Sequence, residues 1–199
     1  GYIMTKSGVA AASGDFFDIH LSGKGTHGAS PDCGNDLIVT ASQIVEALQT
    51  IVSRRLDPLQ PAVVSVCSLH AGEPGAKNVL PAKAILSGTV RTFDVGVRDK
   101  VFELMEQMVQ NICALNGCTG TLVRQPMFPS LANDPRATAL VADAAADVAG
   151  RDHMIPTDQP STGSEDFAWY SQRIPSCFYM FGAAPSSGPV YGGHHPKFD

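Results

Sequence analysis

The chain has 199 residues, of which 44% are hydrophobic, and a formal net charge of -5. This length and apolar content predict one large or two small domains with a packed core, and the negative balance without any Lys/Arg run disfavours nucleic acid as a partner. No apolar stretch approaches the roughly 20 residues of a membrane span, and five cysteines without a C-x-x-C pair are typical of free thiols in a cytoplasmic protein.

The first part of the chain predicts a strand, a loop and a helix. Apolar residues at every second position indicate a half-buried strand at 17–21, and a glycine-rich loop follows over 23–35. Apolar residues at helical spacing then predict an amphipathic helix over 37–52. Pro58 and Pro61 exclude a continuation of this helix, because proline lacks the backbone donor that a helix interior needs.

The next part predicts two strands, a helix and a further strand. Valine-rich alternation indicates a strand over 62–69, and a second strand is expected over 84–92 after a long loop. Asp94 is a good N-cap for the second helix, because its side chain can accept from free backbone N–H groups. Gly117 ends this helix, and a last strand is expected over 119–125.

The predicted order is therefore strand–helix–strand–strand–helix–strand over about residues 15–127. This βαββαβ order is typical of ferredoxin-like domains, in which both helices cover one face of a four-stranded antiparallel sheet. The G-x-G-x-x-G sequence at 23–28 follows a strand, as dinucleotide-binding loops do. However, Pro31 intervenes before the helix begins near Asp36, so a dinucleotide site is disfavoured. The expected fold class is α+β.

The rest of the chain predicts a different kind of structure. Asp134, which precedes a proline, is expected to cap an alanine-rich helix that runs to Gly150. Ser164 is expected to cap a short helix over 165–173, and the apolar run at 176–182 is typical of a buried strand. Because these elements do not readily form a core alone, we expect them to pack against a part of the protein outside this sequence.

Three polar residues of the βαββαβ region have both a structural and a functional interpretation. His27 is either a solvated loop histidine or a group that a substrate can approach through its glycine-lined surroundings. Asn78 lies in a long loop, where it either forms a turn or contributes to function. Arg91 lies near the end of a predicted strand and can pair with a carboxylate of the protein or of a ligand.

Two polar pairs in the rest of the chain leave the same alternatives open. His194 and His195 follow two glycines and are either exposed loop residues or metal ligands, since neutral imidazole binds metals. A metal site needs three or four protein ligands, and no H-E-x-x-H motif is present. Glu165 and Asp166 can act as acid, base or metal ligands, or simply favour the dipole of a helix start.

These residues lie in five blocks that together resemble the aminoacylase/carboxypeptidase-like metallopeptidases. The blocks are GKGTHGASP at 23–31, NVLP at 78–81, GTVRTFD at 88–94, GSEDF at 163–167 and HHPKFD at 194–199. They follow the family's order and span nearly the whole chain. The sequence is similar above all to the amidohydrolase branch, which includes hippurate hydrolase, N-acyl-amino-acid amidohydrolases and indole-acetyl-amino-acid hydrolases.

The resemblance implies a fold, a reaction and partners. Residues 15–127 would be the lid domain, through which the family forms homodimers. Residues 128–199 would be the C-terminal portion of an α/β catalytic domain, with residues 1–14 as the link from its missing half. The implied enzyme cleaves the amide bond of small hippurate-like N-acyl amino acids with water activated by two divalent ions, zinc or manganese. A non-catalytic dimerisation module and a dipeptidase of the same family are the alternatives.

The resemblance also implies roles for the lid residues. His27 would be catalytic, reaching the active site of the partner subunit and steadying the oxyanion of the tetrahedral intermediate. Asn78 and Arg91 would bind substrate. Arg91 would do so by pairing its guanidinium fork with the free carboxylate of the N-acyl amino acid.

Further roles are implied for the C-terminal blocks. Gly163 and Ser164 would bind substrate on the acyl side of the site, with Glu165 as the catalytic candidate there. His194 would be a metal ligand, with His195 as the alternative. The H-x-C-G-H-D block and the Glu-Glu pair of the family do not occur in this sequence. We therefore expect at most one metal ligand in this chain, and an isolated fragment that is inactive.

Overall fold

The computed structural model describes residues 1–185 and 187–198, so Asp199 of the last sequence block lies outside the described residues. The chain forms two compact units, which are described separately below. The larger unit comprises Ala11–Ser130 and Thr162–Asp166, and the smaller comprises Gly1–Ala10, Leu131–Ser161 and Phe167–Asp199. In the described part of the chain, no helix has the length and apolar character needed to cross a membrane.

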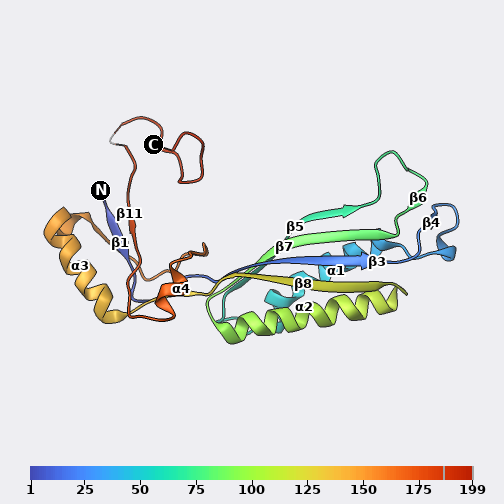
Figure 1. The fold of residues 1–199 in the computed structure, drawn as a ribbon, viewed down its shortest axis with the longest axis horizontal. Helices are drawn as coiled ribbons and strands as arrows, with labels where there is room; N and C mark the ends of the chain where they lie inside the picture. Colours follow the sequence, from blue (N-terminus) through green and yellow to red (C-terminus); the bar gives the residue numbers. More distant parts are fainter. Residues whose placement is uncertain (186, 199) are drawn as a thin grey trace. The chain divides into compact units, whose positions relative to one another are not determined.

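The larger unit is built on a four-stranded antiparallel sheet that carries two long helices (Figure 1). Its elements in chain order are β3 (Gly14–Ser22), α1 (Leu37–Thr50), β5 (Ala62–Ala71), β7 (Lys83–Thr92), α2 (Val95–Leu115) and β8 (Thr119–Phe128). The strand order in the sheet is β5–β7–β3–β8. The predicted βαββαβ order is therefore confirmed, and it gives the sheet order of a ferredoxin-like domain.

Burial of one sheet face explains why these segments form strands and helices. In β3, Phe17, Ile19 and Leu21 are buried, whereas Phe16 and His20 on the opposite face are exposed. The buried residues form one core cluster with the apolar stripes of both helices. Alternation in the strands and helical spacing in the helices therefore bring one apolar face from each element into the same core.

One end of α2 contributes a thiol to this core. Cys113 is buried near the end of the helix, whereas Cys33 and Cys67 are exposed. Burial, with a smaller contribution from neighbouring Cys118, raises the pKa of the Cys113 thiol to about 12. Since the thiolate is the reactive form, Cys113 is an inert core side chain at neutral pH.

Aspartates cap both long helices, whereas the sequence predicted this role only for Asp94. Asp36 accepts hydrogen bonds from two backbone N–H groups of the first turn of α1, and Asp94 accepts from Val97 N at 3.0 Å. The helix that we expected over 37–52 ends as α-helix at Thr50 and continues as a π-helical turn over Ile51–Arg55. The second helix ends just before Gly117, whose φ of +67° lies in the left-handed region that glycine tolerates best.

The smaller unit contains a short three-stranded sheet and two helices. Its strand order is β10–β1–β11, with β1 parallel to β10 and antiparallel to β11. Its main elements are β1 (Ile3–Thr5), α3 (Pro135–Ala149), β10 (Met154–Pro156), α4 (Ala168–Ser171) and β11 (Tyr179–Phe181). A two-stranded ladder joins β2 (Gly8–Ala11) to β9 (Leu131–Asn133). Asp134 caps α3, as predicted.

Two predictions for the last third of the chain were wrong. The helix expected over 165–173 covers only Ala168–Ser171, because the Ser164 hydroxyl accepts a hydrogen bond from Arg91 instead of capping a helix. The strand expected to be buried over 176–182 forms only at Tyr179–Phe181, and all three residues are exposed. This strand lies at the edge of its sheet, and no described element covers its apolar side chains.

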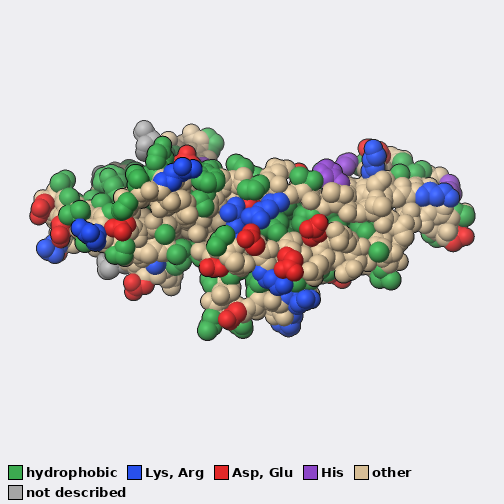
Figure 2. Space-filling model, turned by 60° about the horizontal axis from the view of Figure 1, so that its bottom comes forward, with side chains coloured by type: hydrophobic (Ala, Val, Ile, Leu, Met, Phe, Trp, Pro, Cys, Tyr) green, Lys and Arg blue, Asp and Glu red, His purple; other side chains and the backbone are tan. Residues whose placement is uncertain are grey.

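Charged side chains are mixed on the molecular surface. On the face displayed in Figure 2, basic and acidic side chains lie among each other, and neither sign forms an extended patch free of the other. This mixing matches the modest net charge of -5.

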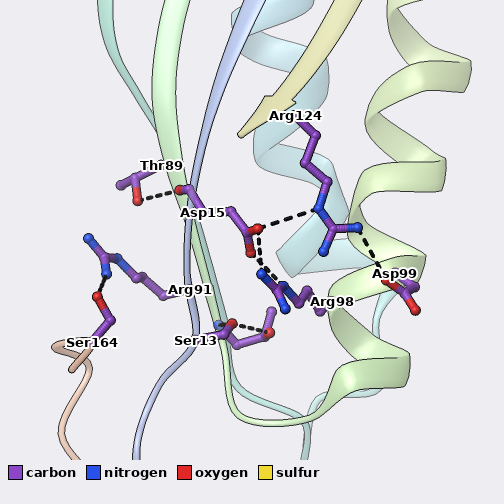
Figure 3. Close-up of polar contacts among 9 residues, drawn as sticks. Ser13, Asp15, Thr89, Arg91, Arg98, Asp99, Arg124 and Ser164 are labelled. Atoms are coloured by element: carbon purple, nitrogen blue, oxygen red, sulfur yellow. Dashed lines mark hydrogen bonds and ion pairs between the residues drawn. The ribbon is translucent and has the colours of Figure 1, made fainter. Parts of the chain in front are cut away.

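A buried ion-pair network joins β3, α2 and β8 (Figure 3). The Asp15 carboxylate is fully buried and accepts two hydrogen bonds from Arg98, both at 2.6 Å. Arg124 approaches the same carboxylate at 3.4 Å, lies over the Phe102 ring and pairs with the exposed Asp99 at 3.2 Å. Two guanidinium groups thus compensate one buried charge and fix the start of β3 against the start of α2.

We predict that Asp15→Asn destabilises the chain by about 3 kcal/mol, because the neutral amide keeps the shape but leaves Arg98 without its buried counter-charge. Urea unfolding of the purified chain measures this loss. Asp99→Asn is the matched control, since it removes an exposed partner of Arg124, and it should cost less than about 1 kcal/mol. Equal effects of the two substitutions would contradict this account of the network.

Candidate functional site

His27 and Asn78 meet at one end of the larger unit. His27 belongs to β4 (Thr26–His27), which pairs antiparallel with β6 (Val79–Leu80), directly after Asn78. The Asn78 side-chain nitrogen lies 3.2 Å from Nε2 of His27, and the Ala29 N–H donates to Nδ1 at 3.1 Å. Because Nδ1 accepts a hydrogen bond, the neutral ring carries its proton on Nε2, and the Asn78 amide can turn its oxygen toward that proton.

Close backbone contacts explain the glycines of the loop that carries His27. A Cβ on Gly25 would lie 2.9 Å from the Leu80 carbonyl oxygen, and a Cβ on Gly34 would meet the Lys24 carbonyl oxygen at 2.5 Å. Both positions therefore require glycine, because only a residue without a side chain lets these backbone segments approach so closely.

Asn35 holds the base of this loop and was missed by the sequence reasoning. Its side chain accepts from Lys24 N at 2.8 Å and donates to the carbonyl oxygens of Asn116 and Gly117 at 3.1 Å. It thereby ties both ends of the loop to the end of α2. A Gly-Asn-Asp sequence before a helix is a turn signal, but nothing in it identifies the distant carbonyls.

A surface cavity of about 450 Å³ lies beside the ribbon. Gly28 and Val79 line it on the ribbon side, with apolar Ile38 and Leu69 and charged Lys77 among the other lining residues. This volume lies in the range of small-molecule sites. The cavity is therefore large enough for a small ligand next to the His27–Asn78 pair.

Arg91 and Ser164 form a second polar cluster in the same unit (Figure 3). Arg91 lies near the end of β7 on the sheet face opposite the core, and its Nη1 donates to the Ser164 hydroxyl. Gly163 and Glu165 flank this serine, and the Glu165 carboxylate accepts from the neighbouring Asp166 N–H at 3.1 Å. None of the ion pairs among the described residues involves Arg91, so the described part of the chain offers no partner for the salt bridge that the sequence left as an alternative.

The two clusters lie at opposite ends of the same sheet. The ribbon that carries His27 precedes Lys83, the first residue of β7, whereas Arg91 is the last but one residue of that strand. Figure 1 shows β4 and β6 at one end of the sheet. Eight residue steps of about 3.3 Å along a strand put more than roughly 25 Å between the clusters. The sheet of one chain therefore holds His27 and Arg91 too far apart to touch one small substrate.

The two C-terminal histidines lie in an exposed loop of the smaller unit. The His195 ring stacks on Tyr191 with centroids 4.4 Å apart, and its Nδ1 accepts from Lys197 N at 3.1 Å. His194 is exposed and makes no side-chain hydrogen bond among the described residues. The His195 ring thus has partners within the loop, whereas neither ring nitrogen of His194 is hydrogen-bonded to another described residue.

The described residues do not assemble a metal site. No group of three or more His, Cys, Asp or Glu side chains lies close enough together to hold a metal ion in the part of the chain that the structure describes. His194 by itself offers one imidazole. The residues present therefore do not fit a complete one-metal or two-metal centre.

Comparisons with known proteins agree on one family. A model of peptidase family M20/M25/M40 matches residues 12–199. N-acetyl-L-cysteine deacetylase of Bacillus subtilis (strain 168) is 37% identical over 198 residues, which cover 100% of this chain and 45% of the relative. N-acetyldiaminopimelate deacetylase of Geobacillus sp. (strain WCH70) is 35% identical over 197 residues, which cover 99% of this chain and 50% of the relative.

A solved structure gives the same result. The crystal structure of the YXEP protein of Bacillus subtilis, described as a dinuclear metal binding peptidase from the M20 family, superposes with a TM-score of 0.74 at 32% identity. The match covers 99% of this chain and 47% of that chain. The present chain spans about half the length of the curated relatives it matches.

We predict that Asn35→Ala loosens the loop that carries His27 without unfolding the unit, because the loop loses three hydrogen bonds. Amide hydrogen exchange over residues 24–35 should become roughly tenfold faster, as expected for the loss of one to a few bonds. Gln49→Ala is the control, since it removes one exposed side-chain bond on α1. Unchanged exchange over 24–35 would show that Asn35 does not hold the loop.

Proposed function

This chain belongs to peptidase family M20/M25/M40, and we propose that the protein that contains it hydrolyses the amide bond of N-acyl amino acids. The relatives named N-acetyl-L-cysteine deacetylase and N-acetyldiaminopimelate deacetylase support this substrate class. The observation that carries the proposal is the environment of Arg91. Its guanidinium is held by a neutral hydroxyl and forms no ion pair with a described carboxylate.

Arg91 is the group that recognises the free carboxylate of the substrate in this proposal. A guanidinium has five N–H donors in a planar fork that fits a carboxylate with two parallel hydrogen bonds. Arg91 also lines a surface cavity of about 370 Å³, together with Phe16, Thr89 and Gln125 on the open face of the sheet. Gly163 and Ser164 lie at the same end, and we assign Gly163 to the substrate-binding region and Ser164 to the support of Arg91, with Glu165 as an acid–base candidate beside them.

His27 and Asn78 act on the amide carbonyl in this proposal. The neutral His27 ring has its proton on Nε2, so it can donate to an oxygen that gains negative charge during attack on the amide. Asn78 lies beside the same ring nitrogen, and once the substrate oxygen takes the Nε2 proton in its place, its amide nitrogen can donate to that oxygen as well. Two adjacent donors of this kind stabilise an oxyanion better than a ground-state carbonyl, which lowers the barrier of the chemical step.

Each active site needs two copies of the chain in this proposal. The sheet holds His27 and Arg91 more than roughly 25 Å apart, so His27 of the partner subunit would complete the site that contains Arg91. We therefore propose a homodimer with residues 15–127 as its lid and dimerisation domain. Residues 128–199 would be the C-terminal portion of the catalytic domain, joined by the link at 1–14. The five free cysteines support a cytoplasmic location.

The metal ions of the proposed enzyme depend on residues outside this sequence. We propose two divalent ions, zinc or manganese, with His194 as the ligand that this chain supplies and His195 as the less suited alternative. The surroundings of the two rings support that order, since the His195 ring is stacked and already accepts a hydrogen bond, whereas His194 has no side-chain hydrogen bond to a described residue. The other ligands would belong to the half of the relatives' length that this chain does not cover. The isolated 199-residue chain is accordingly expected to be inactive.

We predict that the complete protein hydrolyses N-acetylcysteine and N-benzoylglycine, and that a metal chelator abolishes this activity until zinc or manganese is restored. Release of the free amino acid measures the reaction. Unblocked dipeptides are the comparison, because their acyl group carries a charged amine. Hydrolysis of dipeptides alone would favour the dipeptidase alternative. Activity toward neither class would favour a non-catalytic dimerisation module.

We also predict that two impaired variants recover activity when they are expressed together. His27→Ala and Arg91→Met damage different ends of the unit, so one site of a mixed dimer keeps both residues intact, one from each subunit. Co-expression should therefore recover about a quarter of wild-type activity when subunits combine at random. His27→Ala co-expressed with the His27→Ala/Arg91→Met double variant is the control and should recover none. No recovery in the first pair would contradict a shared site.

A further inference from the structure

We propose that Ser164 and Gly14 position the Arg91 guanidinium for the substrate carboxylate. Ser164 accepts its hydrogen bond, and Gly14 has no side chain in the space where the side chains of Ser164 and Arg91 meet. This inference rests on the proposed function, since it takes Arg91 as the carboxylate-binding group. It assigns Ser164 to Arg91 rather than to the acyl group of the substrate. Figure 3 shows Ser164 reaching Arg91 from a separate chain segment.

The Ser164 hydroxyl engages only one edge of the guanidinium. It accepts from Nη1, and no other side-chain hydrogen bond of Arg91 occurs among the described residues. The remaining donors of the planar group are left for a ligand. A long, flexible side chain loses conformational freedom when it binds, so an acceptor that fixes it beforehand lowers the cost of binding.

A neutral acceptor suits this role better than a carboxylate. An aspartate in place of Ser164 would neutralise the guanidinium and compete with the carboxylate of the substrate for the same donors. The hydroxyl orients the group and leaves its positive charge in place. Among the described residues, the carboxylate of Asp15 is directed instead to Arg98 and Arg124 in the network on the other side of the sheet.

Main-chain hydrogen bonds hold Ser164 in place. The carbonyl oxygen of Gly163 accepts from Ala12 N at 3.1 Å. The next residue, Ser13, donates its N–H to Thr92 O at 2.6 Å, and the hydroxyls of Ser13 and Thr92 lie 2.8 Å apart in a buried pair. The segment that carries Ser164 is thus tied to the start of β3, and the start of β3 is tied to the residue next to Arg91.

Gly14 supplies the space for this contact. A Cβ at Gly14 would lie 2.5 Å from Ser164 Oγ and 2.6 Å from Arg91 Nη1, far inside van der Waals contact. Any other side chain would therefore separate the hydroxyl from the guanidinium. The backbone cannot easily shift to relieve this clash, because the next residue, Asp15, is fixed by the buried ion pairs.

The test uses the complete enzyme with two substrates, an N-acetyl amino acid and its carboxamide, which lacks the carboxylate. We expect Ser164→Ala to raise KM for the acid roughly five- to tenfold, the range for losing one ordinary hydrogen bond. The kcat and the KM for the carboxamide should change by less than about twofold, within the scatter of surface substitutions. Ser164→Thr keeps the hydroxyl and should restore KM. Ser42→Ala, on the exposed surface of α1, is the control.

Two further variants make the result independent of one substitution. Gly14→Ala should raise KM for the acid as Ser164→Ala does, whereas Gly75→Ala, where a Cβ meets no atom within 4 Å, should not. If Ser164→Ala does not fold, Ser164→Cys answers the same question, because sulfur is a weak acceptor of similar size. In an Arg91→Met background, Ser164→Ala should have no further effect on KM.

The outcomes separate this inference from the proposed function. If Arg91→Met leaves KM for the acid unchanged, the proposed role of Arg91 is wrong. If Arg91→Met raises KM but the changes at Ser164 and Gly14 do not, only the positioning inference is overturned. It is also overturned if Ser164→Ala raises KM for the carboxamide equally or acts without Arg91, since Ser164 would then contact the substrate directly.

Discussion

The buried carboxylate of Asp15 is the constraint on which the larger unit depends. A charge without exposure to water is tolerated only when it is paired and hydrogen-bonded, and here two guanidinium groups from α2 and β8 provide the pairing. The network fixes the start of β3. From there the register of the sheet follows, because β3 pairs with both β7 and β8 along its length. The position of Gly14, and hence the meeting of Arg91 with Ser164, is a consequence of this anchor.

The periodic part of the fold could be predicted from the sequence. Phe17, Ile19 and Leu21 alternate in β3, and apolar residues recur at helical spacing in α1, so type and order of the elements were readable. The short strand β1 and its partner β10 were not foreseen. Three residues do not establish a period, and β1 pairs with residues about 150 positions away.

The candidate site was predictable as a set of residues but not as a geometry. The sequence blocks pointed to His27 and Asn78, and the structure brings them together at 3.2 Å. The same reasoning treated Ser164 as a helix cap, because a serine before an acidic residue is a common start signal. The tertiary contact with Arg91 overrides that local preference. The function of Asn35 was also hidden, since its partners lie 81 and 82 positions away in the sequence.

The length of the sheet has a consequence for how such a protein can vary. β3 and β7 pair without interruption from Asp15 and Val90 to Ser22 and Lys83. Removing one residue from one strand would turn the remaining side chains to the wrong face, so a shorter sheet requires paired deletions of two residues in several strands at once. The distance between the two ends of the sheet is therefore expected to stay nearly constant as the sequence changes. Sequence drift can alter the loops at either end freely, but it cannot gradually shorten the distance between His27 and Arg91.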